Sequence, residues 1–170
     1  MTVQRFCQHL AALLPHLDPA LRLEVVAVEL ALFFGVEEHE VAYFKIDSAG
    51  RMATFCWPPP QFGQLGNIPL KSLTTSLLAA TAREKKGFCN NAFAATPHLH
   101  MFERMLADTE QRVTVQKIIS VPLLQGDQAK GVLQVSRKGA DLASAGTDFS
   151  ATDLQKLEAI AQTLAPITLT

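Results

Sequence analysis

Two extended apolar segments joined by a tight turn, near the end of the chain, constrain the fold more than any other feature. The segments are 117–125 and 130–137, and the intervening Gly126-Asp127 is typical of the turn of a β-hairpin. Apolar residues occupy both sides of the first strand, so the pattern predicts that neither side faces solvent. The pattern therefore predicts a sheet that is covered on both faces.

Helices are expected at both ends of the chain. Ser150–Asp153 has the spacing of a capping box, and the apolar residues after it recur at steps of three and four. Residues 3–17 carry a similar apolar stripe, which Pro15 should end or kink. The two terminal regions therefore supply helices that can cover one face of the sheet.

A second N-terminal helix is predicted from Asp18-Pro19 to Phe34. Asp18 is a good N-cap, Pro19 suits the first helical position, and Gly35 favours a left-handed stop. Apolar residues nearly surround this helix, so one covered face is not enough to bury them. It needs a sheet on one side and another helix, from this chain or from a second copy, on the other.

The remaining predicted elements lie between this helix and the final hairpin. Strands at 41–46 and 52–57 should form a first hairpin, because the apolar period changes to two around the turn residues 47–50. After it we expect a strand at 67–70, a helix at 73–84 capped by Ser72 and ended by Gly87, a strand at 88–90, and an ambiguous segment at 97–112. The order of elements predicts an α+β domain around one antiparallel sheet. The middle segment, 72–112, should cover the second face, where a loop-rich cover tends to leave a cavity.

Length and charge narrow the classes of partner. A chain of 170 residues with 48% apolar content suits one domain with a substantial core. Its net charge of -1 argues against nucleic acid, which usually requires a basic face. The densest basic group, Arg83, Lys85 and Lys86, is interrupted by Glu84 and is read as the solvated end of a helix. We expect neither a nucleic-acid nor a membrane partner.

The N-terminus and the cysteines indicate a cytoplasmic protein. Residues 1–17 lack a positive region followed by an unbroken apolar run, so they do not resemble a signal peptide. The most apolar stretch, 21–36, carries three charged residues and is too short to span a bilayer. Cys7, Cys56 and Cys89 show no CxxC spacing and are expected to be reduced thiols.

Several segments resemble a GAF domain, a family related to PAS domains. Ile119–Leu123 with Gly131–Val135 resembles its penultimate hairpin, and Asp148–Leu154 resembles the entry into its closing helix. Upstream, the segments similar to the family's first turn and middle region are 46–50, 68–70, 77–87 and 90–91. From the extent of the match we expect the domain at residues 18–170. Residues 1–17 would form an N-terminal helix and a candidate dimer contact.

The resemblance implies a six-stranded antiparallel sheet, with terminal helices on one face and a pocket covered by loops and a helix on the other. Members bind cyclic nucleotides, haem, bilins, small acids or no known ligand, and many pair through terminal helices. The asparagine-lysine, phenylalanine and aspartate-glutamate pattern of cyclic-nucleotide-binding members is missing, and Cys89 is followed by Asn90 instead of the bilin-attaching histidine. The cofactor therefore stays open.

The candidates for the pocket are aromatic and polar side chains of the middle region and of the final hairpin. They are Phe55, Trp57, Phe62, Asn90, Asn91, Phe93, His98, Phe102 and Gln134. The aromatic rings could stack on a flat ligand while Asn90, Asn91 or Gln134 orients it, although core packing explains each aromatic residue taken singly. His98 and His100 could bind a metal or haem, and the acidic run 37–40 could bind a metal, but a loop or helix-end role and a connector role explain them better.

Cys89 raises an enzymatic alternative. The free methionine-R-sulfoxide reductases, a branch of the family, carry a cysteine in a comparable strand and need a second one to resolve the product. Here the segment 98–102 has no cysteine where that branch has its nucleophile, which favours a structural thiol. No serine-histidine-aspartate, phosphate-loop or HExxH motif is present either.

The resulting expectation is a non-catalytic module that senses a small molecule. It would act as a homodimer through its terminal helices and through an effector protein in trans, since no output segment was recognised. A ligand-free dimerisation adaptor is the first alternative, and a thiol-dependent methionine sulfoxide reductase is the second.

Overall fold

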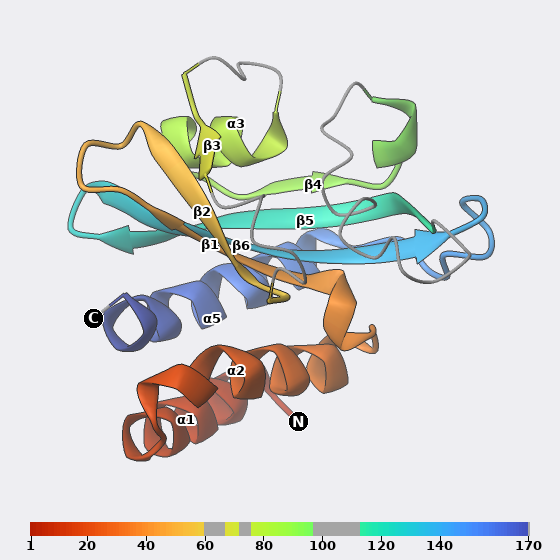
Figure 1. The fold of residues 1–170 in the computed structure, drawn as a ribbon. Helices are drawn as coiled ribbons and strands as arrows, with labels where there is room; N and C mark the ends of the chain where they lie inside the picture. The colour runs from red at the N-terminus through yellow and green to blue at the C-terminus, as the bar shows by residue number, and fades with distance from the viewer. Residues whose placement is uncertain (60–66, 72–75, 97–112, 170) are drawn as a thin grey trace.

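The protein is built on one antiparallel sheet with helices on both faces (Figure 1). The computed structural model describes residues 1–59, 67–71, 76–96 and 113–169. Within these ranges six strands follow the order β3-β2-β1-β6-β5-β4, and every neighbouring pair is antiparallel. The predicted α+β class and six-stranded antiparallel sheet are confirmed.

The strands are β1 (Val41–Ile46), β2 (Met52–Trp57), β3 (Asn67–Pro69), β4 (Phe88–Asn90), β5 (Thr114–Gln125) and β6 (Gln128–Gly139). The helices are α1 (Val3–Leu13), α2 (Pro19–Phe34), α3 (Leu77–Glu84) and α5 (Ala151–Thr168), with short 3-10 turns η1 (Leu14–His16), η2 (Glu38–Glu40) and η3 (Phe93–Ala95). Both predicted hairpins and both N-terminal helices are present.

One pairing decides where the two hairpins meet. β1 pairs with β6, so that Lys45 lies opposite Gly131 and Tyr43 lies opposite Leu133. Because these strands are antiparallel, the end of β1 lies beside the start of β6. The turns of the two hairpins, 47–50 and 126–127, therefore lie at the same end of the sheet.

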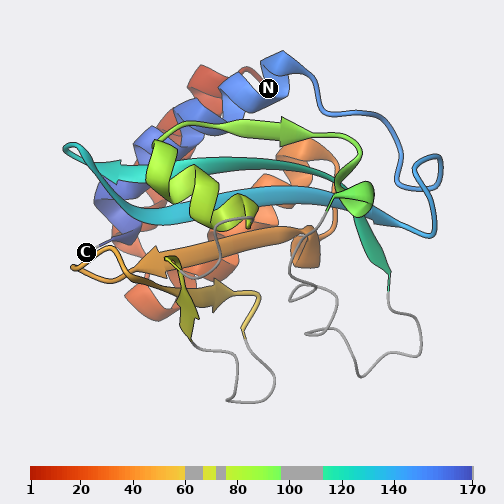
Figure 2. The same cartoon turned by 90° about the horizontal axis from the view of Figure 1, so that it is seen from above.

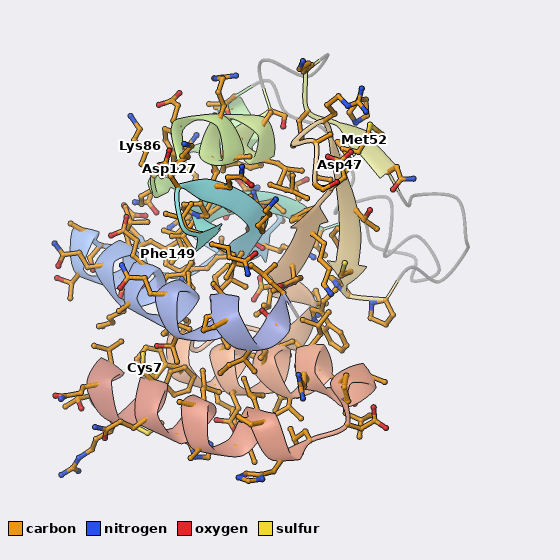
Figure 3. The ribbon with its side chains drawn as sticks, turned by 90° about the vertical axis from the view of Figure 1, so that its left-hand side faces the viewer. Cys7, Asp47, Met52, Lys86, Asp127 and Phe149 are labelled. Carbon is orange, nitrogen blue, oxygen red and sulfur yellow. The ribbon has the colours of Figure 1, made fainter. Side chains whose placement is uncertain are left out.

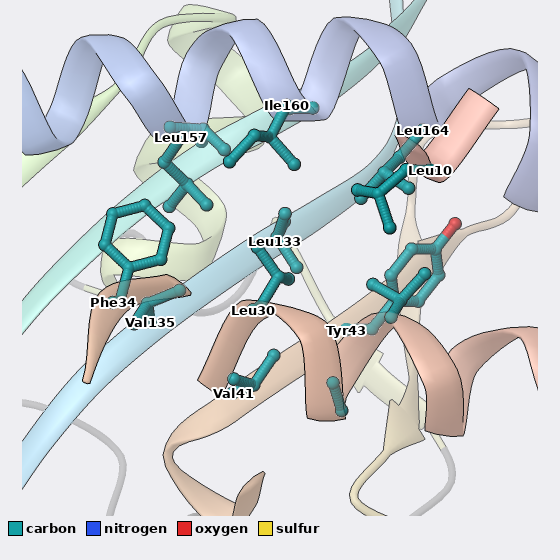
Figure 4. Close-up of a cluster of buried hydrophobic side chains, with 14 of the residues drawn as sticks. Leu10, Leu30, Phe34, Val41, Tyr43, Leu133, Val135, Leu157, Ile160 and Leu164 are labelled. Atoms are coloured by element: carbon teal, nitrogen blue, oxygen red, sulfur yellow. The ribbon is translucent and has the colours of Figure 1, made fainter. Parts of the chain in front are cut away.

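The terminal helices cover one face, which we call the terminal-helix face. α2 packs on β1 and β2, α5 packs on β5, and α1 packs on α5. Figure 4 shows the continuous apolar cluster between these helices and the sheet. Its fully buried members include Leu10 of α1, Leu30 of α2, Leu133 of β6 and Leu164 of α5. The N-terminal helix thus belongs to the same core as the rest of the chain.

The opposite face, which we call the α3 face, is covered differently. Figure 2 shows α3 lying over the sheet, where it contacts β5 and β6. Beneath it, buried apolar residues form two clusters instead of one. The larger includes Phe44, Phe55, Leu78 and Val132, and the smaller consists of Phe93, Val115 and Ile118.

The predicted start and stop residue of α3 were wrong, whereas its last helical residue, Glu84, was predicted correctly. The helix begins at Leu77, and its N-cap is Ser76, whose Oγ accepts a hydrogen bond from the Ala79 N–H at 3.0 Å. Ser72, the predicted cap, lies outside the described residues. At the other end the left-handed C-cap is Lys85, with φ 54°, and not Gly87, where we expected the helix to stop.

Gly87 has another role. A Cβ there would lie 2.5 Å from a carboxylate oxygen of Glu158 and 2.9 Å from Leu154 Cδ1, so a larger residue would require these two α5 side chains to shift. The ambiguous segment 97–112 also lies outside the described residues.

The apolar circumference of α2 is only partly covered. Phe34 and the neighbouring apolar residues face the core, and Phe33 stacks on Phe6 of α1 with ring centroids 4.3 Å apart. The predicted sheet and second helix are therefore both present. Leu21 and Leu32 nevertheless remain 51% and 76% exposed.

Candidate functional site

The structure brings three of the predicted pocket residues to the α3 face: Phe55 of β2, Phe93 of η3 and Gln134 of β6. Phe55 is buried and meets Phe44 edge to face, with ring centroids 5.0 Å apart. Phe93 is buried in the smaller cluster. Phe62, His98 and Phe102 lie outside the described residues, so their role in a pocket stays a prediction.

Trp57 lies on the other side of the sheet, against the cluster of the terminal-helix face. The pairing of β1 with β2 shifts register here, since Tyr43 lies opposite Trp57 while Phe44 lies opposite Phe55. Cys56 is therefore an extra residue in β2, and the alternation that would place Trp57 beside Phe55 is reversed. The indole Nε1 donates to the carbonyl of Glu38 at 3.3 Å.

The two asparagines hold the backbone around β4. The Oδ1 of Asn90 accepts from the N–H of Ala92 at 2.9 Å. Asn91 bonds both backbone groups of Phe149: its Nδ2 donates to the carbonyl and its Oδ1 accepts from the N–H, each at 2.9 Å. Their polar atoms thus fix a turn and the loop that leads into α5.

A buried chain of hydrogen bonds runs beneath α3. The Nε2 of Gln134 donates to Ser120 Oγ at 3.1 Å, Ser120 Oγ contacts Thr81 Oγ1 at 2.8 Å, and Thr81 Oγ1 donates to the carbonyl of Leu77 at 2.8 Å. Thr81 has a single hydroxyl proton, which the carbonyl accepts, so Ser120 must donate to Thr81. Ser120 must then accept from the Gln134 amide.

This direction means that the Gln134 amide uses its nitrogen, and not its oxygen, in the hydrogen-bond chain. Gln134 is 4% exposed, and its Oε1 accepts no hydrogen bond from any residue that the structure describes. The oxygen is therefore left as an acceptor at the α3 face. Sequence reasoning identified Gln134 but missed Ser120 and Thr81, because only the packing of α3 on β5 brings them together.

A cavity of about 520 Å³ opens at the end of the α3 face where the two hairpin turns meet. We call it the hairpin-end cavity; α3 and both turns line it, as do the start of β6 and residues 70–71. Figure 3 views the molecule from this end, with Asp47 of the first turn and Asp127 of the second turn labelled below α3. None of the predicted pocket residues that the structure describes lines this cavity.

The lining of the cavity combines an apolar base with a charged margin. The apolar side chains come from Ile46, Ala49, Leu70, Ala79, Ala82 and Ala129. The charged side chains are Lys71, Arg83, Lys85, Lys130, Asp47 and Asp127. Arg83 and Lys85 are exposed at the end of α3, as the sequence predicted. The meeting of the two turns beside them was missed, because it follows from the pairing of β1 with β6.

The thiols lack the environment of an activated nucleophile. Cys89 Sγ donates to the carbonyl of Phe149 at 3.6 Å. Burial raises the pKa of this thiol, and the nearby carboxylates of Asp148 and Asp153 raise it further. Burial likewise raises the pKa of Cys56. At neutral pH both are therefore mainly protonated, whereas the thiolate is the nucleophilic form.

The acidic connector before β1 serves a structural purpose. Glu40 is buried, and its carboxylate accepts hydrogen bonds from the backbone N–H groups of Glu37 and Lys138. Among the residues that the structure describes, no group of three or more potential metal ligands is gathered in one place. Nor does any helix in those ranges combine the length and the apolar character needed to cross a membrane.

Solved structures with this fold include GAF domains and a reductase. The GAF domain of an Acinetobacter phosphoenolpyruvate-protein phosphotransferase is 14% identical with a TM-score of 0.69, covering 99% of this chain and 94% of that one. The corresponding domain from Coxiella burnetii is 13% identical with a TM-score of 0.71, covering 97% and 91%. Free methionine-R-sulfoxide reductase from Neisseria meningitidis is 16% identical with a TM-score of 0.67, covering 98% and 87%.

Identities this low show a shared fold and nothing about ligand or activity. No curated protein sequence matches the chain. The GAF domain family model, in contrast, matches residues 18–166, which is nearly the whole chain, and the protein therefore belongs to the GAF domain family.

Proposed function

We propose that this protein is a non-catalytic sensory module that binds a small molecule on its α3 face. It would form a homodimer and pass its signal to a separate partner protein. The family is generally sensory or regulatory, although some proteins with this fold are enzymes. The observation that carries the proposal is the hairpin-end cavity, whose volume of about 520 Å³ falls within the usual range for small-molecule sites.

A stripe along α2 supports the homodimer. Leu21, Val25, Val28 and Leu32 follow one another at steps of four, three and four, which places them on one face of the helix. The outer members are exposed, and the inner two are only half-buried. The apolar stripe of α1 is already used inside the chain, so α2 is the surface that a second copy would cover.

The two surfaces lie on opposite faces of the same strand. Ile46 at the end of β1 lines the cavity, and α2 packs on the other face of β1. A ligand would change the dimer only through different affinities for two arrangements of the helices. β1 is the direct connection between the two surfaces.

Native mass spectrometry under reducing conditions tests both parts of the proposal. We expect a dimer that retains, or takes up from a metabolite mixture, a molecule of discrete mass. Leu32→Lys should give a monomer, while Leu142→Lys, which alters an exposed leucine of the 140–149 loop, should remain dimeric. A monomer at every concentration would remove the homodimer, and a dimer that takes up no molecule would favour the adaptor alternative.

The reductase alternative is less well supported, because the Cys89 thiol is held protonated and bonded to backbone. It predicts turnover of free methionine sulfoxide that Cys89→Ser abolishes. Undetectable turnover by the unmodified protein excludes it.

A further inference from the structure

We infer that the hairpin-end cavity selects small aliphatic anions, such as carboxylates with a short apolar chain. This inference rests on the proposed function and adds the chemical class of the ligand. It comes from three features of the lining. Cations outnumber anions at the margin, the acidic side chains already have hydrogen-bond or ion-pair partners, and the base is aliphatic.

Cations outnumber anions at the margin of the cavity. Lys71, Arg83, Lys85 and Lys130 line it, against Asp47 and Asp127. A cavity lined by an excess of one sign of charge, with a low-dielectric wall behind it, concentrates counter-ions of the opposite sign. The margin therefore attracts anions.

Both carboxylates at the margin already have partners. Asp127 Oδ2 pairs with Lys85 Nζ at 2.9 Å. Asp47 Oδ1 accepts from the backbone N–H groups of Arg51 at 2.7 Å and Met52 at 3.2 Å, and these bonds lower the pKa of its carboxyl. Asp47 is thus held in place by its own turn and Asp127 by Lys85.

The other cations at the margin are much less engaged. Among the described residues, neither Lys71 nor Lys130 forms an ion pair. Arg83 reaches only Glu84, at 3.5 Å, and that carboxylate also binds Lys86 at 2.9 Å. Lys71, Arg83 and Lys130 therefore have donors left for an anion, and Lys130 is the half-buried one.

The base of the cavity suits an aliphatic body. Ile46, Leu70 and Ala79 are buried side chains of the larger apolar cluster on this face. None of the described lining residues is aromatic, so the cavity offers no ring on which a flat base could stack. An acid with a short alkyl chain can place its chain on this base and its carboxylate at the margin.

Isothermal titration with matched probes tests the inference. Aliphatic carboxylates from butyrate to decanoate are compared with the corresponding neutral amides, which keep the chain and lose the charge. We expect the best carboxylate to bind at least about threefold more tightly than its amide, a factor typical of a partly exposed ion pair. The difference should shrink as salt is raised.

Three variants locate the effect. Lys130→Gln should remove most of the preference for carboxylate over amide. Lys156→Gln, which removes an equal charge from α5 on the other side of the sheet, should leave it unchanged. Ala129→Phe, which adds a ring to the base of the cavity, should abolish binding of both series. Thermal unfolding checks that each variant is folded.

The outcomes separate the inference from the proposed function. Equal binding of acids and amides that Ala129→Phe abolishes would overturn the anion preference and leave small-molecule binding in place. A carboxylate preference that survives Lys130→Gln would overturn the assigned margin. If no member of either series binds the unmodified protein, both the inference and this site for the proposed function fail.

Discussion

Ser120→Ala tests the buried hydrogen-bond chain beneath α3. Ser120 is fully buried; it accepts from Gln134 and donates to Thr81. Alanine removes both bonds at once. It leaves an N–H of Gln134 without an acceptor and the Thr81 oxygen without its donor, both in a site that excludes water.

The magnitude follows from what each partner loses. A buried polar group left without a partner costs about 1–3 kcal/mol. The Gln134 donor bears this cost in full, whereas Thr81 still donates to the Leu77 carbonyl and loses less. We therefore expect Ser120→Ala to lower the free energy of unfolding by about 2–4 kcal/mol.

The direction of the chain also predicts an order among single variants. Thr81→Val leaves the Ser120 hydroxyl proton without an acceptor. Gln134→Leu removes only the hydrogen bond that the Ser120 oxygen accepts. Ser120→Ala should therefore cost the most and Gln134→Leu the least in hydrogen bonding. The triple variant removes every member of the chain, so it should cost less than the sum of the three single changes.

Urea unfolding measures these differences, provided the slope of free energy against denaturant stays constant among variants. A loss of unfolding free energy below about 1 kcal/mol for Ser120→Ala would show that the Gln134 N–H finds another hydrogen-bond acceptor. Additive costs within about 0.5 kcal/mol would show that the three side chains do not act as one chain. Either result refutes a single buried chain of hydrogen bonds beneath α3, and a Gln134→Leu cost above that of Ser120→Ala refutes the direction assigned to the bonds.

Three further perturbations follow from single contacts. A Cβ on Gly131 would lie 2.7 Å from the carbonyl oxygen of Phe44, so Gly131→Ala should destabilise the protein by about 1–3 kcal/mol in urea unfolding; an unchanged midpoint would contradict this. Burial and then Lys138 lower the pKa of His39 below 6.5, so the unfolded state binds the proton more readily and stability falls as the pH drops below that value. His39→Gln should reduce this fall between about pH 7.5 and pH 5.5, and an identical pH profile would count against it. Because the Cys89 pKa is raised, iodoacetamide should modify that thiol more slowly than free cysteine at neutral pH, as followed by peptide mass spectrometry; faster modification would revive the reductase alternative.

Elements defined by local chemistry could be predicted from the sequence. α2 begins after Asp18 with Pro19 in its first position and ends at Gly35, because each of those residues satisfies a backbone requirement within one turn. Ser150 and Asp153 form the predicted capping box at the start of α5. The two hairpin turns were predictable for the same reason.

Features set by neighbours in space could not be predicted in this way. The sequence around Cys56 does not predict the β-bulge there, which places the Trp57 side chain on the terminal-helix face. Serine is a good cap at either position 72 or 76; the structure uses Ser76, and the Leu78 and Ala79 that follow it are buried in the larger cluster of the α3 face. Gly87 was expected to stop the helix, but it lies where the Glu158 and Leu154 side chains of α5 approach the chain.

The two faces of the sheet differ in how their apolar residues are arranged, and this difference favours the α3 face as the site of the proposed ligand. The terminal-helix face is one continuous apolar cluster drawn from helices and strands, and opening it would expose much of the core. On the α3 face the apolar residues are divided into two clusters, and a polar chain and a cavity lie on the same face. A molecule can therefore bind there without disrupting the main core. The α2 surface of the proposed dimer lies across the sheet from the cavity, so in the proposed sensor a ligand would act on the dimer through β1, whose residues alternate between the two faces.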